Sequence, residues 1–75
     1  MMFEYIPVKE DLFSKEIGKY SAFGIKVMLV VDEKYEIGTA SDVSDDYTVA
    51  DRIAKYCNRK QVSPLDFLNT VSIFL

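Results

Sequence analysis

Apolar and polar positions alternate along the segment from Tyr20 to Val31, YSAFGIKVMLVV. From residue 23 onward every odd-numbered position is apolar, whereas the even-numbered positions are mixed. A side-chain period of two, carried by β-branched and aromatic residues, is typical of a strand that buries one face. The length of the segment predicts the central strand of a small antiparallel sheet.

The residues before this segment predict an edge strand. Residues 3–8, FEYIPV, have the strand pattern, and Pro7 places the strand at an edge because proline cannot donate to a ladder. Residues 9–14 are less regular, so we expect a bulge or a break there. Ile17-Gly18 is the best turn, because glycine supplies the positive φ of a tight hairpin.

This turn defines a register for the first hairpin. It sets Glu16 beside Lys19 and Leu12 beside Phe23. Ile6, Val8 and Leu12 then share a face with the odd positions of the central strand. Glu10 would point inward as well, which is unfavourable for a carboxylate and supports the expected bulge.

A third strand is predicted from Tyr35 to Val43, after the charged turn Asp32-Glu33-Lys34. The register that pairs Leu29 with Ile37 and Phe23 with Val43 brings the apolar faces together. A slip by one residue would bury Glu36 and Asp42, so this register is strongly specified.

The period changes at Ser44, which indicates a first helix. Ser44 or Asp45 is the expected cap, and the helix is expected to fray near residues 58–60. Asp51 and Lys55 stand in the favourable order at i,i+4. The apolar face of this helix comprises Val49, Ala50, Ile53, Ala54 and Cys57.

A second helix is predicted from Ser63, as N-cap, through Pro64 at the first helical position to Leu75. Its apolar arc is too wide for a helix that packs on one neighbour only, so we expect it to wedge between the sheet and the first helix. The residues of this arc are Leu65, Phe67, Leu68, Val71, Phe74 and Leu75.

These elements together predict an α+β fold, a three-stranded antiparallel β-meander followed by a two-helix hairpin on one face, in the order βββαα. The length of 75 residues predicts one small domain, residues 1–75, and a chain this short buries only ~60% of its unfolded surface. An apolar content of 49% is enough for a core, and 28% charged residues is ordinary for a globular domain.

The chain resembles a family of short proteins from anaerobic Gram-positive bacteria (Firmicutes) that is classed as a domain of unknown function. The resemblance covers residues 20–75, and it departs from the family pattern at Ser72-Ile73, where members have an acidic pair. It implies a fold and no mechanism. The residues that carry it are Phe23-Gly24-Ile25, the DVSDD segment Asp42–Asp46, Tyr56-Cys57-Asn58, Ser63-Pro64-Leu65 and Phe74-Leu75.

The net charge, the single cysteine and the N-terminal residues argue against several classes of protein. The formal net charge is −3 without a basic block, which argues against a general nucleic-acid binder. Cys57 is alone, so the chain forms no internal disulfide. The N-terminal MMFEYIPVKE has no long apolar run and is neither a signal peptide nor a membrane span. We therefore expect a cytoplasmic protein.

The residues offer little for catalysis. There is no histidine, which excludes a Ser–His–Asp triad and a Cys–His pair. Cys57 lies on the apolar face near a helix C-terminus, where its thiol is not activated, so a core role is favoured. The carboxylates at 42, 45, 46 and 51 match no EF-hand spacing, and helix capping accounts for two of them. We expect no catalytic residue, no cofactor, no metal and no small-molecule substrate.

The strongest functional indication is geometric, because two helices cover only one face of such a sheet. Aromatic- and methionine-rich patches are typical of interfaces, so we expect the helix-free face to bind a partner protein or a second copy as a homodimer. The alternative is that the N-terminal segment covers this face or that its hydrophobic residues are scattered. The residues placed there are Phe3, Tyr5, Tyr20, Ala22, Met28 and Val30.

A second indication is a basic stripe on the exposed face of the first helix, Arg52, Lys55 and Arg59 at i, i+3 and i+7. It suggests a small regulatory protein that contacts nucleic acid or an acidic partner, although a solvated face is the commoner explanation.

Three hypotheses follow: a non-enzymatic interaction module, which is favoured, a regulator that uses the stripe, and an enzyme that uses Tyr and Asp residues, which has least support.

Overall fold

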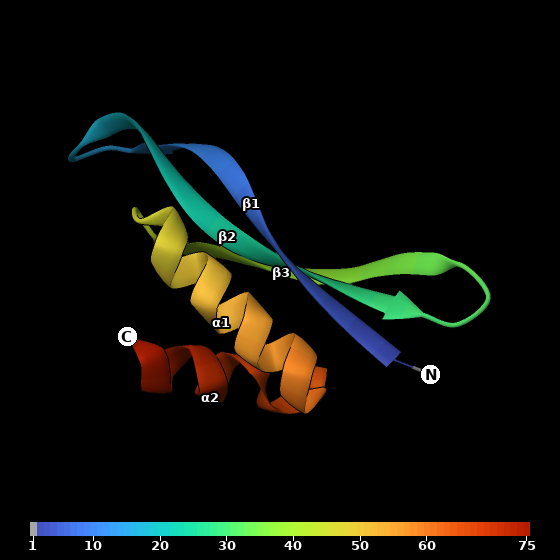
Figure 1. Cartoon of the computed structure of the whole chain (residues 1–75). Helices are drawn as coiled ribbons and strands as arrows, with labels where there is room; N and C mark the ends of the chain where they lie inside the picture. The colour runs from blue at the N-terminus through green and yellow to red at the C-terminus, as the bar shows by residue number, and fades with distance from the viewer. Residues whose placement is uncertain (1) are drawn as a thin grey trace.

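The structure, a computed structural model, describes residues 2–75 and has three strands followed by two helices (Figure 1). The strands are β1 (Met2–Ser14), β2 (Gly18–Val30) and β3 (Lys34–Ser44), and the helices are α1 (Tyr47–Lys60) and α2 (Pro64–Phe74). The sheet is antiparallel with β2 in its centre. Both helices lie below the sheet in the view of Figure 1. The predicted α+β fold in the order βββαα is confirmed.

The core lies between one face of the sheet and the two helices. Ile25 and Val27 of β2 are buried, at 0% and 4% exposure, which confirms that the odd-numbered side of β2 faces the helices. Residues of both helices complete this core: Ala50, Ile53, Ala54, Cys57, Phe67 and Val71.

The hairpin of β1 and β2 differs from its prediction in turn and register. β1 runs without a register shift from Met2 to Ser14, so the expected break at residues 9–14 is wrong. Residues 15–17 form the turn and Gly18 follows it with φ +85°. Leu12 therefore pairs with Tyr20, and Glu16 lies in the turn rather than beside Lys19.

This shift of three residues turns every side chain of β1 to the opposite face of the sheet. Phe3 and Tyr5 pair with Leu29 and Val27 and face the helices. Ile6, Val8 and Leu12 lie on the helix-free face, opposite to the prediction. The physical reason is that Gly18 serves as the left-handed residue after a three-residue loop, and not as the second residue of a tighter turn.

β3 is an irregular edge strand. Leu29 pairs with Tyr35 and Phe23 with Ser44, so the predicted partners Ile37 and Val43 are wrong. The register shifts twice along the pair, between Phe23 and Ile25 and between Val27 and Met28. Each shift lengthens β3 relative to β2, and such bulges are common at sheet edges. A strict period of two therefore does not predict which residues of β3 are buried.

The helices begin close to where the pattern predicts. Asp46 caps α1 by accepting a hydrogen bond from Thr48 N at 2.9 Å, so the helix starts later than a cap at Ser44 or Asp45 implies. Ser63 caps α2 with Pro64 next to it, as predicted. The predicted wedge of α2 between sheet and α1 is wrong, because α2 buries only Phe67 and Val71.

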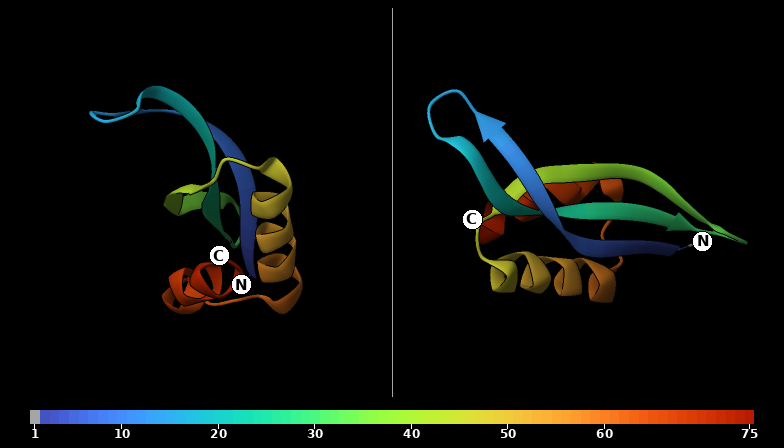
Figure 2. Two further views of the ribbon diagram at one scale, coloured as in Figure 1. Left: turned by 90° about the vertical axis from the view of Figure 1, so that its left-hand side faces the viewer. Right: turned by 90° about the horizontal axis from the view of Figure 1, so that it is seen from above.

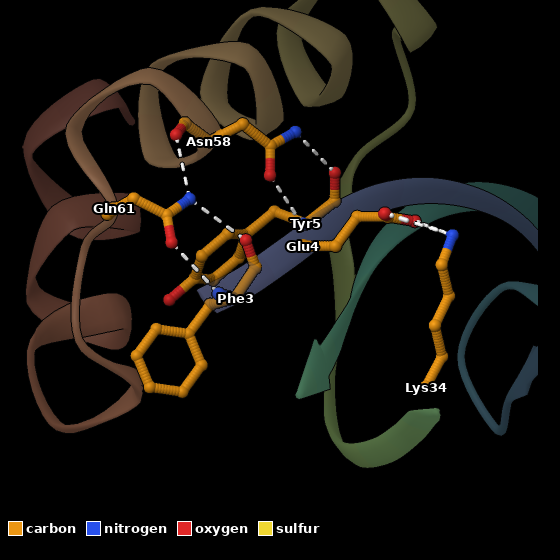
Figure 3. A network of polar contacts seen from close by, with 6 residues as sticks. All are labelled: Phe3, Glu4, Tyr5, Lys34, Asn58 and Gln61. Atoms are coloured by element: carbon orange, nitrogen blue, oxygen red, sulfur yellow. Dashed lines mark hydrogen bonds and ion pairs between the residues drawn. The ribbon is translucent and has the colours of Figure 1, made fainter. Parts of the chain in front are cut away.

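The C-terminal end of α1 is bonded to the outer edge of β1, as Figure 3 shows. The amide of Asn58 accepts from Tyr5 N at 2.7 Å and donates to Tyr5 O at 2.9 Å. The amide of Gln61 does the same for Phe3, with both distances 2.9 Å. The two amides satisfy backbone groups that an edge strand otherwise leaves unpaired. α1 therefore ends beside anchored residues and is helical through Lys60, where the sequence predicted fraying.

Pro7 is compatible with this arrangement. Phe3 and Tyr5 direct their N–H groups outward, and the alternation of an antiparallel ladder gives Pro7 the same outward direction. A missing N–H at that point removes no bond to β2. The predicted edge position of this strand is confirmed.

The Tyr5 side chain inserts between the sheet and the helices. Its ring lies 5.0 Å from that of Phe67, and its hydroxyl donates to the backbone oxygen of Val62. Burial, with a smaller contribution from Cys57, raises the pKa of Tyr5 to about 12. Tyr5 thus joins β1 to the connection between α1 and α2.

We predict that Asn58→Ala lowers the free energy of unfolding by about 2 kcal/mol, because two part-buried backbone groups of Tyr5 lose their partners. Urea denaturation of both proteins measures the difference. Asn69→Ala is the matched control, since Asn69 is exposed on α2 and its replacement is expected to leave stability unchanged within about 0.5 kcal/mol. An equal loss in the two variants would contradict a specific role for Asn58.

Candidate functional site

The helix-free face does not bring together the six residues that the sequence placed on it. Tyr5 is 1% exposed in the core, and Phe3 is half-buried against the same core. Ala22 lies on the predicted side but is itself buried at 1% exposure. The other three, Tyr20, Met28 and Val30, are half-buried on the helix-free face.

Charged side chains lie on this face in place of Phe3 and Tyr5. The Nζ of Lys34 lies 3.1 Å from Glu4 Oε2, across β2, and Lys26 lies 3.8 Å from Glu36. Figure 3 shows the Glu4–Lys34 pair directed away from the helices. The face is therefore a mixed surface, and the predicted placement of Phe3 and Tyr5 on it is wrong because the β1 register is wrong.

Glu10 forms a polar cluster on this face by crossing over Gly24. One oxygen of its carboxylate accepts from Asp42 N and the other from the Ser41 hydroxyl, each at 2.8 Å. A Cβ on Gly24 would lie 2.6 Å from both Glu10 Oε1 and the Ala40 backbone oxygen. Glu10 thus faces away from the helices, contrary to the expectation, and bonds β1 to β3 across a strand that needs glycine at this point.

Asp42 lies at one end of this cluster. Its backbone is left-handed, with φ 54°, and its carboxylate accepts from the Tyr20 hydroxyl at 2.8 Å. This hydrogen bond to a carboxylate raises the pKa of Tyr20 above its usual value. The cluster holds the bulged end of β3 in place, and every group in it already has a protein partner.

Several large apolar side chains are exposed on α2 and at Leu75, its C-cap residue. Leu65 is 92% exposed, Leu68 67% and Leu75 68%, on the stripe where the sequence predicted burial. Ile73, at 84%, lies on another side of the helix. Figures 1 and 2 show α2 at the outer side of the molecule, with no element below it.

A groove of about 200 Å³, here called the α2–β3 groove, separates α2 from the edge strand. Its walls include Ile37 of β3 and Leu68 of α2, and its floor includes Val27 and Phe67 from the core. No charged residue lines it; the full set is Val27, Ile37, Gly38, Thr39, Ala40, Pro64, Phe67 and Leu68. The groove is suited to apolar side chains of another chain.

The predicted basic stripe lies along a second groove, of about 540 Å³, on the outer side of α1. Arg52, Lys55 and Arg59 all line it, so the structure brings these residues together. Lys55 is paired with Asp51 at 2.9 Å, and this hydrogen bond raises the pKa of Lys55. Arg59 lies over the Tyr56 ring, 5.7 Å from its centroid.

Tyr56 contacts Phe74 edge-to-face, with ring centroids 5.3 Å apart. The second groove therefore has an aromatic wall beside its guanidinium groups, which the helical spacing alone did not predict. Tyr56 of this wall belongs to α1 and Phe74 to α2, so only the packing of the two helices forms it.

The remaining candidates carry no indication of chemistry. Cys57 is 0% exposed, and burial raises its pKa, which disfavours the reactive thiolate. Within residues 2–75, no group of three or more acidic, Cys or His side chains is placed to hold a metal ion. In the same part of the chain, neither helix has the length and apolar character needed to cross a bilayer.

The chain belongs to a family of unknown function, DUF6514, whose model matches residues 1–75. This confirms the resemblance to a domain of unknown function. Comparison with curated proteins and with solved structures found no match.

We predict that Gly24→Ala lowers the free energy of unfolding by about 2 kcal/mol, because the new methyl group displaces the Glu10 carboxylate and the β3 backbone. Gly38→Ala is the matched control in the same sheet, since no atom lies within 4 Å of its added Cβ. We expect that change to be neutral or to stabilise by up to about 1 kcal/mol. Thermal unfolding of the two variants beside the parent protein checks both signs.

Proposed function

We propose that this protein is a non-enzymatic interaction module that binds another protein chain through α2 and the α2–β3 groove. The observation that carries the proposal is the exposure of α2. Its Leu65 and Leu68 are 92% and 67% exposed, next to an open groove whose lining has no charge. Soluble monomers rarely expose contiguous apolar patches of this kind unless the patch is an interface.

The distribution of polar groups supports this proposal. The hydroxyls of Thr70 and Ser72 are bonded to the helix backbone, to Asp66 O at 3.0 Å and Leu68 O at 3.1 Å. Burial of this surface under a partner would therefore cost little for these two side chains. An interface core of apolar residues with satisfied hydroxyls is typical of protein–protein contacts.

The proposed role is binding and not catalysis, and the proposed location is the cytoplasm. Its support is the chemistry of the side chains, since the chain has no histidine and its single cysteine is buried with a raised pKa. A reduced, buried thiol is typical of intracellular proteins.

A second candidate is an acidic partner in the groove lined by Arg52 and Arg59. The observation in its favour is the aromatic wall of Tyr56 and Phe74, because guanidinium groups beside aromatic rings are a common means of binding anionic chains. The two candidates use different surfaces and differ in their response to salt.

We predict that Leu68→Asp abolishes capture of the partner from a lysate of the native host, because a carboxylate would be buried in the apolar contact. Affinity capture read by mass spectrometry measures this. Phe13→Asp is the control, since Phe13 is 70% exposed near the tip of the β1–β2 hairpin. Partners retained equally by both variants would exclude α2 as the contact surface.

The second candidate makes the opposite prediction about salt. Binding at the Arg52–Arg59 groove is expected to weaken steeply as the salt concentration rises and to be lost on Arg52→Glu. Binding at α2 is expected to be insensitive to both changes. A salt titration of the captured complex, with the parent protein and Arg52→Glu side by side, distinguishes the two surfaces.

A further inference from the structure

The exposed residues of α2 have the spacing of a coiled-coil seam. Leu65, Leu68, Ser72 and Leu75 follow one another at intervals of three, four and three residues, which are the a and d positions of a heptad. The three leucines are at least 67% exposed. The buried side of the helix, with Phe67 and Val71, is a separate stripe. α2 thus has one apolar side for its own core and a second, narrower one without a partner in the chain.

We propose that a second copy of this chain occupies the seam, with the two α2 helices antiparallel across a two-fold axis. This inference rests on the proposed function and names its partner. In the register centred on residue 70, Leu65 faces Leu75 of the partner subunit, and Leu68 faces Ser72 of the partner subunit. A two-fold interface requires one patch that complements itself. This seam meets that requirement. Near the axis Leu68 lies opposite Ser72 of the partner subunit, and at each end a leucine lies opposite a leucine.

The polar groups of α2 are compatible with burial in this register. The Ser72 hydroxyl already bonds to Leu68 O at 3.1 Å, so it needs no further partner inside the dimer. Asp66 is the one charged residue of α2 and lies outside the seam. The antiparallel arrangement separates the two Asp66 side chains toward opposite ends and opposes the helix dipoles, which favours association.

The seam is short, because α2 comprises 11 residues. It can supply only a contact at the small end of the range for specific interfaces. We therefore expect a dimer that dissociates on dilution.

The edge of β3 is a less suitable contact for a second copy. Its pairing with β2 shifts register twice, and bulged edges do not extend a sheet regularly. The helix seam has no comparable irregularity, since α2 runs unbroken from Pro64 to Phe74 and the N–H of its C-cap residue Leu75 still bonds to Val71 O. The partner is therefore placed on α2.

Sedimentation of the purified chain over micromolar to millimolar concentration tests the dimer. The mass is expected to rise from 8.6 kDa toward twice that value. Leu65→Asp is expected to weaken the dimer by about a hundredfold, because each interface carries the change twice. Leu65 is 92% exposed, so its replacement leaves the fold of the single chain intact. Ile73→Asp is the matched control on another side of the same helix and is expected to leave the dimer unchanged.

Cysteine crosslinking tests the antiparallel register. Chains with Leu65→Cys are mixed with chains with Leu75→Cys and oxidised mildly, while the buried Cys57 stays unreactive. The expected product is the mixed disulfide, because only residues that face each other meet the geometry of the bond. Disulfides between identical chains as the main product would overturn the antiparallel register.

The outcomes separate this inference from the proposed function. A parent chain that stays monomeric at millimolar concentration overturns the second-copy proposal. If that monomer still captures a partner that Leu68→Asp loses, the proposed function stands alone. If neither self-association nor capture depends on the exposed leucines, both proposals are wrong.

Discussion

The structure depends on how the end of α1 is joined to the outer edge of β1. Asn58 and Gln61 give Tyr5 and Phe3 the donor and acceptor that a neighbouring strand would otherwise supply. A sheet of three strands has two edges, and an uncovered edge invites pairing with another chain. The two amides close one edge with side chains. They also set where α1 lies on the sheet and hence where the core forms.

This junction explains why α2 remains peripheral. α1 lies along β1 and β2 and supplies the fully buried Ala50, Ile53 and Cys57. The short connection after Gln61 is then held by the hydroxyl of Tyr5 on Val62, and α2 begins at Pro64. From that point the helix contributes Phe67 and Val71 to the core, while its leucines face outward. The proposed interface is thus a consequence of the way the single chain completes its core.

The two sides of the sheet are stabilised by different interactions. The helix side is apolar and close-packed, whereas the other side is held by ion pairs and by Glu10, which reaches β3 across Gly24. Exposed ion pairs contribute little to stability, but a carboxylate bonded to a backbone N–H defines where a strand bends. The bulged end of β3 is accordingly held by Glu10 and Asp42.

The sequence alone determined the order of the elements, the central strand, the Ser63 cap and the inward faces of β2 and α1, because these depend on local periodicity and capping. It did not determine the face of Tyr5 or Glu10, since an odd-numbered shift at the Gly18 turn reverses a whole strand and no local preference separates the two registers.

The charged residues of the second groove were predictable from the sequence. Its aromatic wall was not, because the wall needs Phe74 beside Tyr56. The exposed leucines of α2 were visible as a wide apolar arc. The burial of that arc depended on the position of α1, and the tertiary contacts of Asn58 and Gln61 decided that position.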